Sequence, residues 1–288
     1  MNYIVMDLEW NNAYSKKFGS YVCEIFQIGA VKLDSNCNIT DQFSEIIKPQ
    51  ILSEFNSRIL KLTNVNPDDF ENAKSLVEVL ADFEDFVSDD KSVIMTWSKS
   101  DLPVLLENYG YLIPEIKYIP FMSKYMDLQS FVQSVLKTDA GNQISLTNAA
   151  EMLGVVCDDL PPHSAINDSI IATRCLEKVF DEKKMERFIF KTDKSFYKKL
   201  FFKTVYISNI KDKRIVKNDL KFFCPDCKKI LRTKNKWKHK NRSFFNVMMC
   251  PKCKGKYKCV FRAKETGDGI QKSKRMTKIT ENEEQKID

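Results

Sequence analysis

The chain has 288 residues, of which 43% are hydrophobic and 30% charged, and this composition excludes fibrous and low-complexity proteins. No apolar run approaches the roughly 20 residues that cross a bilayer, and Asp7 and Glu9 interrupt the first apolar stretch, unlike a signal peptide. We therefore expect a cytoplasmic protein that does not contact a membrane.

The net charge of +7 is distributed unevenly along the chain. Residues 1–183 contain 15 Lys+Arg and 28 Asp+Glu (net −13), residues 184–263 contain 25 and 5 (net +20), and residues 264–288 contain six of each. An acidic part joined to a basic part indicates two domains, and the basic one is expected to bind a polyanion. The alternative is a lysine-rich surface that is merely solvated.

Hydrophobic patterns in the acidic part predict both strands and helices. The short β-branched or aromatic runs that predict strands are 3–8, 24–33, 38–48 and 92–97. The segments that predict helices are about 72–87, 101–109, 127–137, 145–153 and 164–180. Successive strands followed by alternating strands and helices predict an α/β domain with three layers and a mixed central sheet, whose first three strands form an antiparallel meander.

The basic part divides further. Residues 184–221 interleave Lys with Phe and Tyr and are expected to connect two domains, and residues 222–263 contain two cysteine pairs. Residues 264–288 are charged and nearly devoid of large apolar side chains, so we expect this tail to be disordered.

Three short patterns in the acidic part carry carboxylates. Asp7 and Glu9 lie two apart on a predicted strand, so their side chains share a face, and clustered carboxylates of this kind suit hard divalent ions. Asp101 opens a predicted helix, where it could equally interact with the helix N-terminus. His163 precedes a predicted helix that carries Asp168, although a histidine near a helix start is often structural or exposed.

In this order, Asp7-x-Glu9, Asp101 and His163-x₄-Asp168 resemble the motifs of the DEDDh subgroup of DnaQ-like exonucleases. The resemblance covers about residues 1–182 and is greatest to the KapD and enhanced-RNAi types, which favour RNA. Its framework residues here are Gln27-Ile28-Gly29-Ala30, Leu62-Thr63, Ser145-Leu146 and Ala165-x-Asn167-Asp168 with Ala172. The His-Asn pair that many relatives carry before the second motif is replaced by Ser98, Lys99 and Ser100.

The resemblance implies an RNase H-like fold and 3′→5′ hydrolysis of single-stranded nucleic acid with two Mg²⁺ or Mn²⁺ ions, releasing nucleoside 5′-monophosphates. Asp7 would bridge both ions, Glu9 and Asp168 would complete the first site, and Asp101 would support the second through water. His163 would be the general base. The candidate contacts to the terminal nucleotide are Trp10 and Asn11.

Cys224-Pro-Asp-Cys227 and Cys250-Pro-Lys-Cys253 form two C-x₂-C pairs. Each pair can place two thiolates on one ion, so the four predict a closed, structural Zn²⁺ site of the zinc-ribbon kind. The other five cysteines are expected to be core residues or spare thiols.

Positive charge is dense between the two cysteine pairs. The cations of this loop are Lys228, Lys229, Arg232, Lys234, Lys236, Lys238, Lys240 and Arg242. Cations and an aromatic side chain together can hold phosphates and stack on bases, so Lys234, Lys236, Trp237 and Lys238 are the candidate contacts to nucleic acid. Phe244 and Phe245 are expected in the core of the ribbon, and a protein partner is the alternative to nucleic acid.

Three functions are consistent with these patterns. An exonuclease that acts on RNA is favoured, and a DNA exonuclease used in repair or proofreading is the alternative, because no residue identifies a contact to the 2′-hydroxyl. A catalytically inactive nucleic-acid-binding adaptor is disfavoured because all five motif residues are present.

Overall fold

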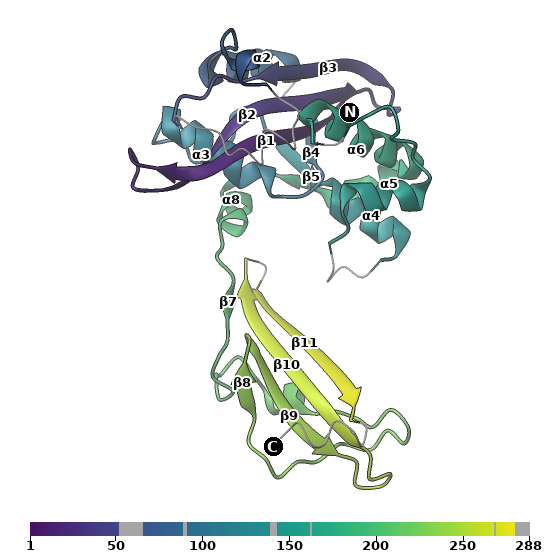
Figure 1. The fold of residues 1–288 in the computed structure, drawn as a ribbon. Coiled ribbons are helices and arrows are strands. Elements are labelled where there is room, and N and C mark those ends of the chain that lie inside the picture. Colours follow the sequence, from purple (N-terminus) through teal and green to yellow (C-terminus); the bar gives the residue numbers. More distant parts are fainter. Residues whose placement is uncertain (52–65, 89–90, 139–142, 162, 268, 280–288) are drawn as a thin grey trace. The chain divides into compact units, whose positions relative to one another are not determined.

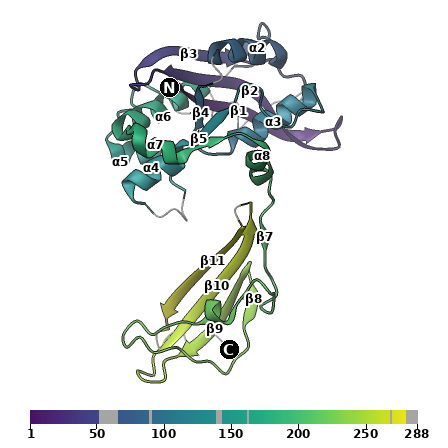
Figure 2. The same cartoon turned by 180° about the vertical axis from the view of Figure 1, so that it is seen from behind.

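The computed structural model describes residues 1–51, 66–88, 91–138, 143–161, 163–267 and 269–279. The chain divides into two compact units, Met1–Tyr197 and Lys198–Asp288 (Figures 1 and 2). The Leu62-Thr63 pair lies outside the described residues.

The first unit contains a six-stranded mixed sheet in the order β3-β2-β1-β4-β5-β6. Its strands are β1 (Tyr3–Ser15), β2 (Ser20–Leu33), β3 (Ile39–Ile46), β4 (Val93–Thr96), β5 (Lys124–Asp127) and β6 (Ile189–Lys191). The predicted antiparallel meander is confirmed for β1, β2 and β3, whereas β4 pairs in parallel with β1 and β5. The sequence patterns did not predict β5 and β6, which are too short to display a period of their own.

All five predicted helices are present in the first unit. They are α2 (Leu76–Val87), α3 (Asp101–Leu112), α4 (Leu128–Leu136), α5 (Leu146–Leu153) and α6 (Ala165–Val179). Shorter helical segments are η1 (Pro67–Phe70), α7 (Glu182–Met185), η2 (Glu186–Phe188) and α8 (Lys194–Leu200). Within the described ranges, no helix has the length and apolar character that a membrane crossing requires.

Helices cover both faces of the sheet and so form three layers. Phe43 of β3 pairs with Ala30, and Ala30 pairs with Met6, so these side chains share one face. Phe83 of α2 contacts Phe43 on that face, with ring centroids 5.0 Å apart. Val5 points to the opposite face and belongs to a core that includes Phe131 of α4, Ala149 of α5 and Ala172 of α6. The expected α/β fold with a mixed central sheet is therefore confirmed.

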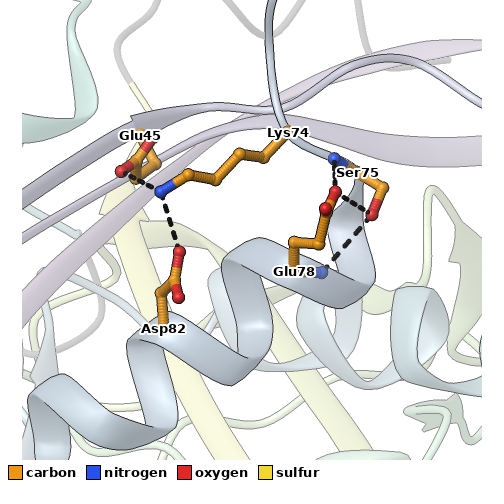
Figure 3. A network of polar contacts seen from close by, with 5 residues as sticks. All are labelled: Glu45, Lys74, Ser75, Glu78 and Asp82. Carbon is orange, nitrogen blue, oxygen red and sulfur yellow. Dashed lines mark hydrogen bonds and ion pairs between the residues drawn. The ribbon is translucent and has the colours of Figure 1, made fainter.

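A polar network attaches the start of α2 to the sheet (Figure 3). Ser75 caps the helix, since its hydroxyl accepts from the backbone of Glu78 while the Glu78 carboxylate accepts from the backbone N–H of Ser75 at 2.8 Å. Lys74 Nζ lies 3.0 Å from Glu45 of β3 and 2.8 Å from Asp82 of α2. These ion pairs are exposed, so the cap contributes more to stability than they do.

The first unit extends beyond residue 183, where the sequence analysis placed its end. β6 pairs with β5, and the Tyr197 hydroxyl accepts a hydrogen bond from the backbone N–H of Ile119 at 2.9 Å. The charge count missed this boundary because the last elements of the acidic domain are themselves lysine-rich.

The second unit is built around an antiparallel sheet in the order β11-β10-β9-β8, with β7 also paired to β10. Its elements are β7 (Val205–Tyr206), η3 (Lys217–Leu220), β8 (Lys238–Lys240), β9 (Ser243–Met249), β10 (Lys256–Thr266) and β11 (Gly269–Lys278). Its small core contains Phe222, Leu231, Phe244, Tyr257 and Phe261. Figure 1 shows β9, β10 and β11 as adjacent strands.

The expectation that residues 264–288 are disordered is wrong for residues 269–278. These residues form β11, which pairs with β10 along its whole length. Lys272 Nζ lies 2.6 Å from Asp219, and Lys274 Nζ donates to the backbone carbonyls of Asn218 and Lys221. Backbone pairing and these contacts stabilise a strand that has few apolar side chains, and composition alone does not reveal such pairing.

Candidate active site and cysteine cluster

The first part of the site lies on β1. Asp7 pairs with Gly29 and Glu9 pairs with Gln27, so both carboxylates project from the face of the sheet that α6 covers. Gln27 and Gly29 also position that helix. The Gln27 side chain accepts from the backbone N–H of Ala165 at 3.1 Å, and the Gly29 carbonyl accepts from the Ser169 hydroxyl at 3.0 Å.

Gly29 permits close contact between the sheet and the helix. A Cβ atom at this position would overlap the backbone of Ala165 and Ile166 at the first turn of α6. Asp168 lies on the next part of that turn, where its N–H donates to the Ser164 carbonyl at 2.9 Å. Because the helix packs directly on a glycine, its acidic side chain is brought to the carboxylates of β1.

Asp101 of α3 contributes a further carboxylate to the same site. It is the first residue of α3, directly after the segment that follows β4, and only 4% of its surface is exposed. Its carboxylate accepts hydrogen bonds from the backbone N–H groups of Asp101 itself and of Leu8, between the two acids of β1. A hydroxyl of Ser100 also lies 3.4 Å from it.

The four carboxylates perturb one another. Desolvation, followed by the charges of Asp101, Asp168 and Glu9, raises the pKa of Asp7 well above its ordinary value. Burial raises the pKa of Asp101 to about 7, and burial with the charges of Asp168 and Asp101 raises the pKa of Glu9 to about 7. For Asp168 burial also raises the pKa, while His163 opposes the shift. The cluster therefore favours bound protons or cations.

His163 lies at the start of α6 in an unusual backbone conformation. Its φ of 64° falls in the left-handed region that favours glycine, and its side chain is exposed. A ring nitrogen of His163 and carboxylate oxygens of Glu9 and Asp168 all lie within 4.8 Å of one another. The exposed imidazole is thus placed beside two of the acids.

The carboxylates line a cavity of about 290 Å³. Its other lining residues are Leu8, Trp10, Trp97, Ser98, Ser100 and Leu146. Leu146 was expected only as a framework residue of the resemblance, and Trp97 was not expected in the site. A larger depression of about 430 Å³ near Tyr118 and Lys191 contains a single carboxylate, Asp193, and lacks a comparable cluster.

Of the two residues expected to contact the terminal nucleotide, only Trp10 lines the cavity. Asn11 is 2% exposed and does not line it. A contact between Asn11 and the terminal nucleotide therefore stays a prediction.

A family model for exonucleases, RNase_T, matches residues 4–176. The chain belongs to this exonuclease family. The match includes β1, α3 and the first turns of α6, and hence all four carboxylates of the cavity.

Two kinds of relative share this exonuclease region. The chain is 25% identical over 156 residues to 3′-5′ exoribonuclease 1 of Homo sapiens, which covers 52% of this chain and 44% of that protein. It is 26% identical over 175 residues to the PolC-type DNA polymerase III of Thermotoga petrophila, which covers 60% of this chain and 11% of that protein. The chain thus spans less than half the length of these relatives.

Solved structures have the same exonuclease fold. One is the nuclease domain of 3′hExo, a DEDDh family member, bound to rAMP, with a TM-score of 0.54 and 22% identity over 63% of this chain and 92% of that one. Another is a 3′-exonuclease described with the recognition of a histone mRNA stem-loop, with a TM-score of 0.54 and 21% identity over 63% and 82%. At these identities the similarity establishes the fold.

The second unit carries the four paired cysteines. Their sulfur atoms all lie within 4.8 Å of one another, with 3.8 Å between Cys224 and Cys253 and 3.5 Å between Cys227 and Cys250. Sulfurs bound at 2.3 Å around one tetrahedral ion are separated by about 3.8 Å. The two printed separations are therefore compatible with a tetrahedral metal site.

The two C-x₂-C turns have equivalent backbones. Lys228 and Lys254, each one residue after a pair, have φ values of 59° and 63°, and their N–H groups donate to the carbonyls of Cys224 and Cys250. The backbone N–H of Cys227 is the largest influence that lowers the pKa of Cys224, to about 6. N–H groups directed at sulfur favour thiolates, the form that binds a metal. The pKa of Cys253 is instead raised to about 12, chiefly by its contact with Cys227, and burial raises the pKa of Cys259, outside the cluster, to about 12.

The loop between the cysteine pairs differs from the expectation at its aromatic residues. Lys234, Lys236 and Lys238 are exposed. Trp237 is half-buried and packs against Phe222 of the core, with ring centroids 6.1 Å apart. Phe244 is buried in the core, as predicted, whereas Phe245 is half-buried on β9.

Proposed function

We propose that the chain is a 3′→5′ exonuclease that degrades single-stranded RNA to nucleoside 5′-monophosphates. The observation that carries the proposal is the convergence of Asp7, Glu9, Asp101 and Asp168 from three elements on one cavity, with His163 beside two of them. Membership of the exonuclease family supports it. The KapD or enhanced-RNAi subtype is part of the same proposal.

The donor set of the cavity fits hard divalent cations. Four carboxylates with raised pKa values repel one another unless protons or cations are bound, and Mg²⁺ and Mn²⁺ prefer oxygen ligands. These four residues would hold two such ions. When bound, the ions supply charge stabilisation for the attacking and leaving oxygens.

The remaining chemistry falls to the protein's own side chains. His163 accepts a proton from the attacking water as its oxygen bonds to phosphorus. The bond between phosphorus and the 3′-oxygen breaks, and a proton from solvent neutralises that oxygen, so one water is consumed and one nucleoside 5′-monophosphate is released. Trp10 and Trp97, which line the cavity, pack against the terminal nucleotide and hold it in line.

A DNA substrate is the second candidate. The relative named 3′-5′ exoribonuclease 1 supports RNA, and the equally similar region of a PolC-type DNA polymerase III supports DNA. We place RNA first because the matched structures include an exonuclease bound to rAMP and one described with a histone mRNA stem-loop.

The cysteine cluster of the second unit fits Zn²⁺. Cys224, Cys227, Cys250 and Cys253 would hold one ion through four thiolates, a set with no open position for substrate. The ion would therefore stabilise the fold of this unit. The second unit, residues 198–288, contains 27 Lys+Arg and 9 Asp+Glu (net +18), which supports single-stranded nucleic acid as its partner, with a protein partner as the alternative.

Strands labelled at either end test the activity. With Mn²⁺, a 3′-labelled RNA strand should release a labelled mononucleotide at once, whereas a 5′-labelled strand should shorten stepwise. Asp7→Asn should abolish both, and Asp41→Asn, which changes an exposed aspartate of β3, should not. First release of the 5′ label, or unchanged turnover in Asp7→Asn, would refute the proposal. A matched DNA strand ranks the two substrates.

A further inference from the structure

The sheet of the second unit has two unlike faces. Tyr257, Cys259 and Phe261 of β10 are buried in the core, so the alternate residues Lys258 and Arg262 point to the other side, where both are exposed. Directly paired residues of an antiparallel sheet share a face, and the strand register therefore assigns the residues of the neighbouring strands to the same open face.

One row of side chains crosses this open face from edge to edge. Lys238 of β8 pairs with Phe245 of β9, Phe245 pairs with Val260 of β10, and Val260 pairs with Arg275 of β11. The two cations at the ends are exposed, and the two apolar side chains between them are half-buried. The row thus places an aromatic ring on the sheet between positive charges.

The neighbouring rows repeat this composition. On one side Lys258 lies between Val247 and Thr277. On the other side Lys240 pairs with Ser243, whose hydroxyl accepts from Arg262 Nε at 3.0 Å.

Tyr206 of β7 extends the face, since it pairs with Lys264 and lies under the guanidinium of Arg242 at 4.9 Å. The open face consequently carries regularly spaced cations that are separated by apolar and hydroxyl side chains.

Among the described residues of β8, β9, β10 and β11, no acidic residue lies on the open face. Within the described residues of β8, β9, β10 and β11, the only acid is Glu265, which belongs to the other face and binds Arg214 at 2.6 Å. In the same part of the chain, Lys238, Lys258 and Arg275 form no ion pair. Lys272, on the core face, is instead committed to Asp219. Most of the positive charge of the strands therefore lies on the open face, and Lys274 and Lys278 are on the other face.

We propose that this open face binds single-stranded nucleic acid, with its lysines and arginines on phosphates and Phe245 against a base. Charge complementarity identifies a polyanion, and the half-buried apolar side chains between the cations suit the bases of an unpaired strand. Residues 234–237, which precede β8, are the weaker candidate, because Trp237 packs on Phe222. The inference rests on the proposed function only in taking the bound strand to be the substrate.

The experiment compares two charge-matched double variants of the full chain. Lys258→Gln with Arg275→Gln removes two cations of the face, and Lys234→Gln with Lys236→Gln removes two of the loop. Binding of a fluorescent oligouridylate of about 20 nucleotides is titrated over a range of salt concentrations. An Asp7→Asn background without added divalent ions prevents degradation, and chelators are omitted so that the cysteine cluster keeps its ion.

The face variant should bind about tenfold more weakly at low salt, and its slope of log Kd against log salt should fall by about 1.4, at roughly 0.7 per lost phosphate contact. The loop variant should change Kd less than about twofold. The inference would be overturned if the loop variant lost as much affinity as the face variant or more. It would also be overturned if the face variant had an unchanged Kd, or if the parent did not bind the strand. Thermal unfolding of both variants excludes misfolding.

A second measurement separates this inference from the proposed function. With Asp7 intact and Mn²⁺ present, cleavage of a trinucleotide tests the exonuclease alone. Retained cleavage by the face variant with weakened binding of the long strand supports both proposals. If the parent does not cleave the trinucleotide and the face variant still binds the long strand more weakly, the proposed exonuclease activity is refuted and the proposed binding face is supported.

Discussion

Replacing Glu9 by Gln removes one of the four clustered carboxylates and keeps the shape of the side chain. Burial and the charges of Asp168 and Asp101 raise the pKa of Glu9 from 4.5 to about 7. At about 1.4 kcal/mol per pKa unit, this shift disfavours the ionised side chain in the folded protein by about 3 kcal/mol. Without divalent ions, Glu9→Gln should therefore be more stable than the parent at alkaline pH.

The direction of the pH dependence follows from the raised pKa. Below pH 4.5 the Glu9 side chain is protonated in both the folded and unfolded protein, so the variant and the parent should differ little. Between pH 4.5 and about 7 the unfolded parent has released the Glu9 proton while the folded parent still holds it, so the parent loses stability as the pH rises to about 7, and the variant does not. The difference should reach its full value of about 3 kcal/mol above pH 8.

Urea unfolding followed by tryptophan fluorescence measures this difference. A Trp237→Phe background leaves Trp10 and Trp97, both in the first unit, as the only reporters. Glu151→Gln, at an exposed position of α5, is the matched control and should have little effect at any pH. The electrostatic reasoning would be refuted if Glu9→Gln raised the free energy of unfolding equally at pH 4.5 and pH 9, or lowered it at pH 9.

Divalent ions should reduce or reverse the stability difference between Glu9→Gln and the parent. Ions that bind only the folded parent stabilise it in proportion to the logarithm of their concentration. Glu9→Gln lacks one ligand and should gain less, so adding Mn²⁺ at pH 8 should narrow or invert the difference. Equal stabilisation of the two proteins by Mn²⁺ would show that Glu9 is not a ligand.

Four further predictions test the site and its supports. His163→Ala should lower kcat by about 10²–10⁴-fold while calorimetry still detects Mn²⁺ binding, and lost binding would instead make His163 a ligand. Gly29→Ala should cost about 1–3 kcal/mol in urea unfolding and reduce kcat, because the start of α6 must move, whereas Gly110→Ala, where a Cβ meets nothing within 4 Å, should not. Ser75→Ala should cost about 1 kcal/mol through the lost cap of α2 and leave kcat unchanged, a result that a fall in kcat would contradict. Cys250→Ser should abolish zinc in elemental analysis and unfold the second unit, while cleavage of short strands persists.

Features set by residues close together in the sequence could be predicted. Asp7 and Glu9 share a face because a strand repeats every two residues, and α6 was predicted from its own periodicity. The C-x₂-C spacing brings two sulfurs together within one turn, so the four-cysteine cluster was also predicted from the chain. The family match over residues 4–176 agrees with the region that the motifs marked.

Features set by contacts between distant segments required the tertiary structure. Trp97 and Leu146 line the cavity but belong to segments that are far apart in the sequence. The burial of Asn11 depends on how the bulged strand β1 packs in the sheet. β11 is a strand because β10 offers a backbone to pair with, which its own lysine-rich sequence does not reveal. The same pairing decided which cations of the second unit share a face, since register fixes side-chain direction across a sheet and composition does not.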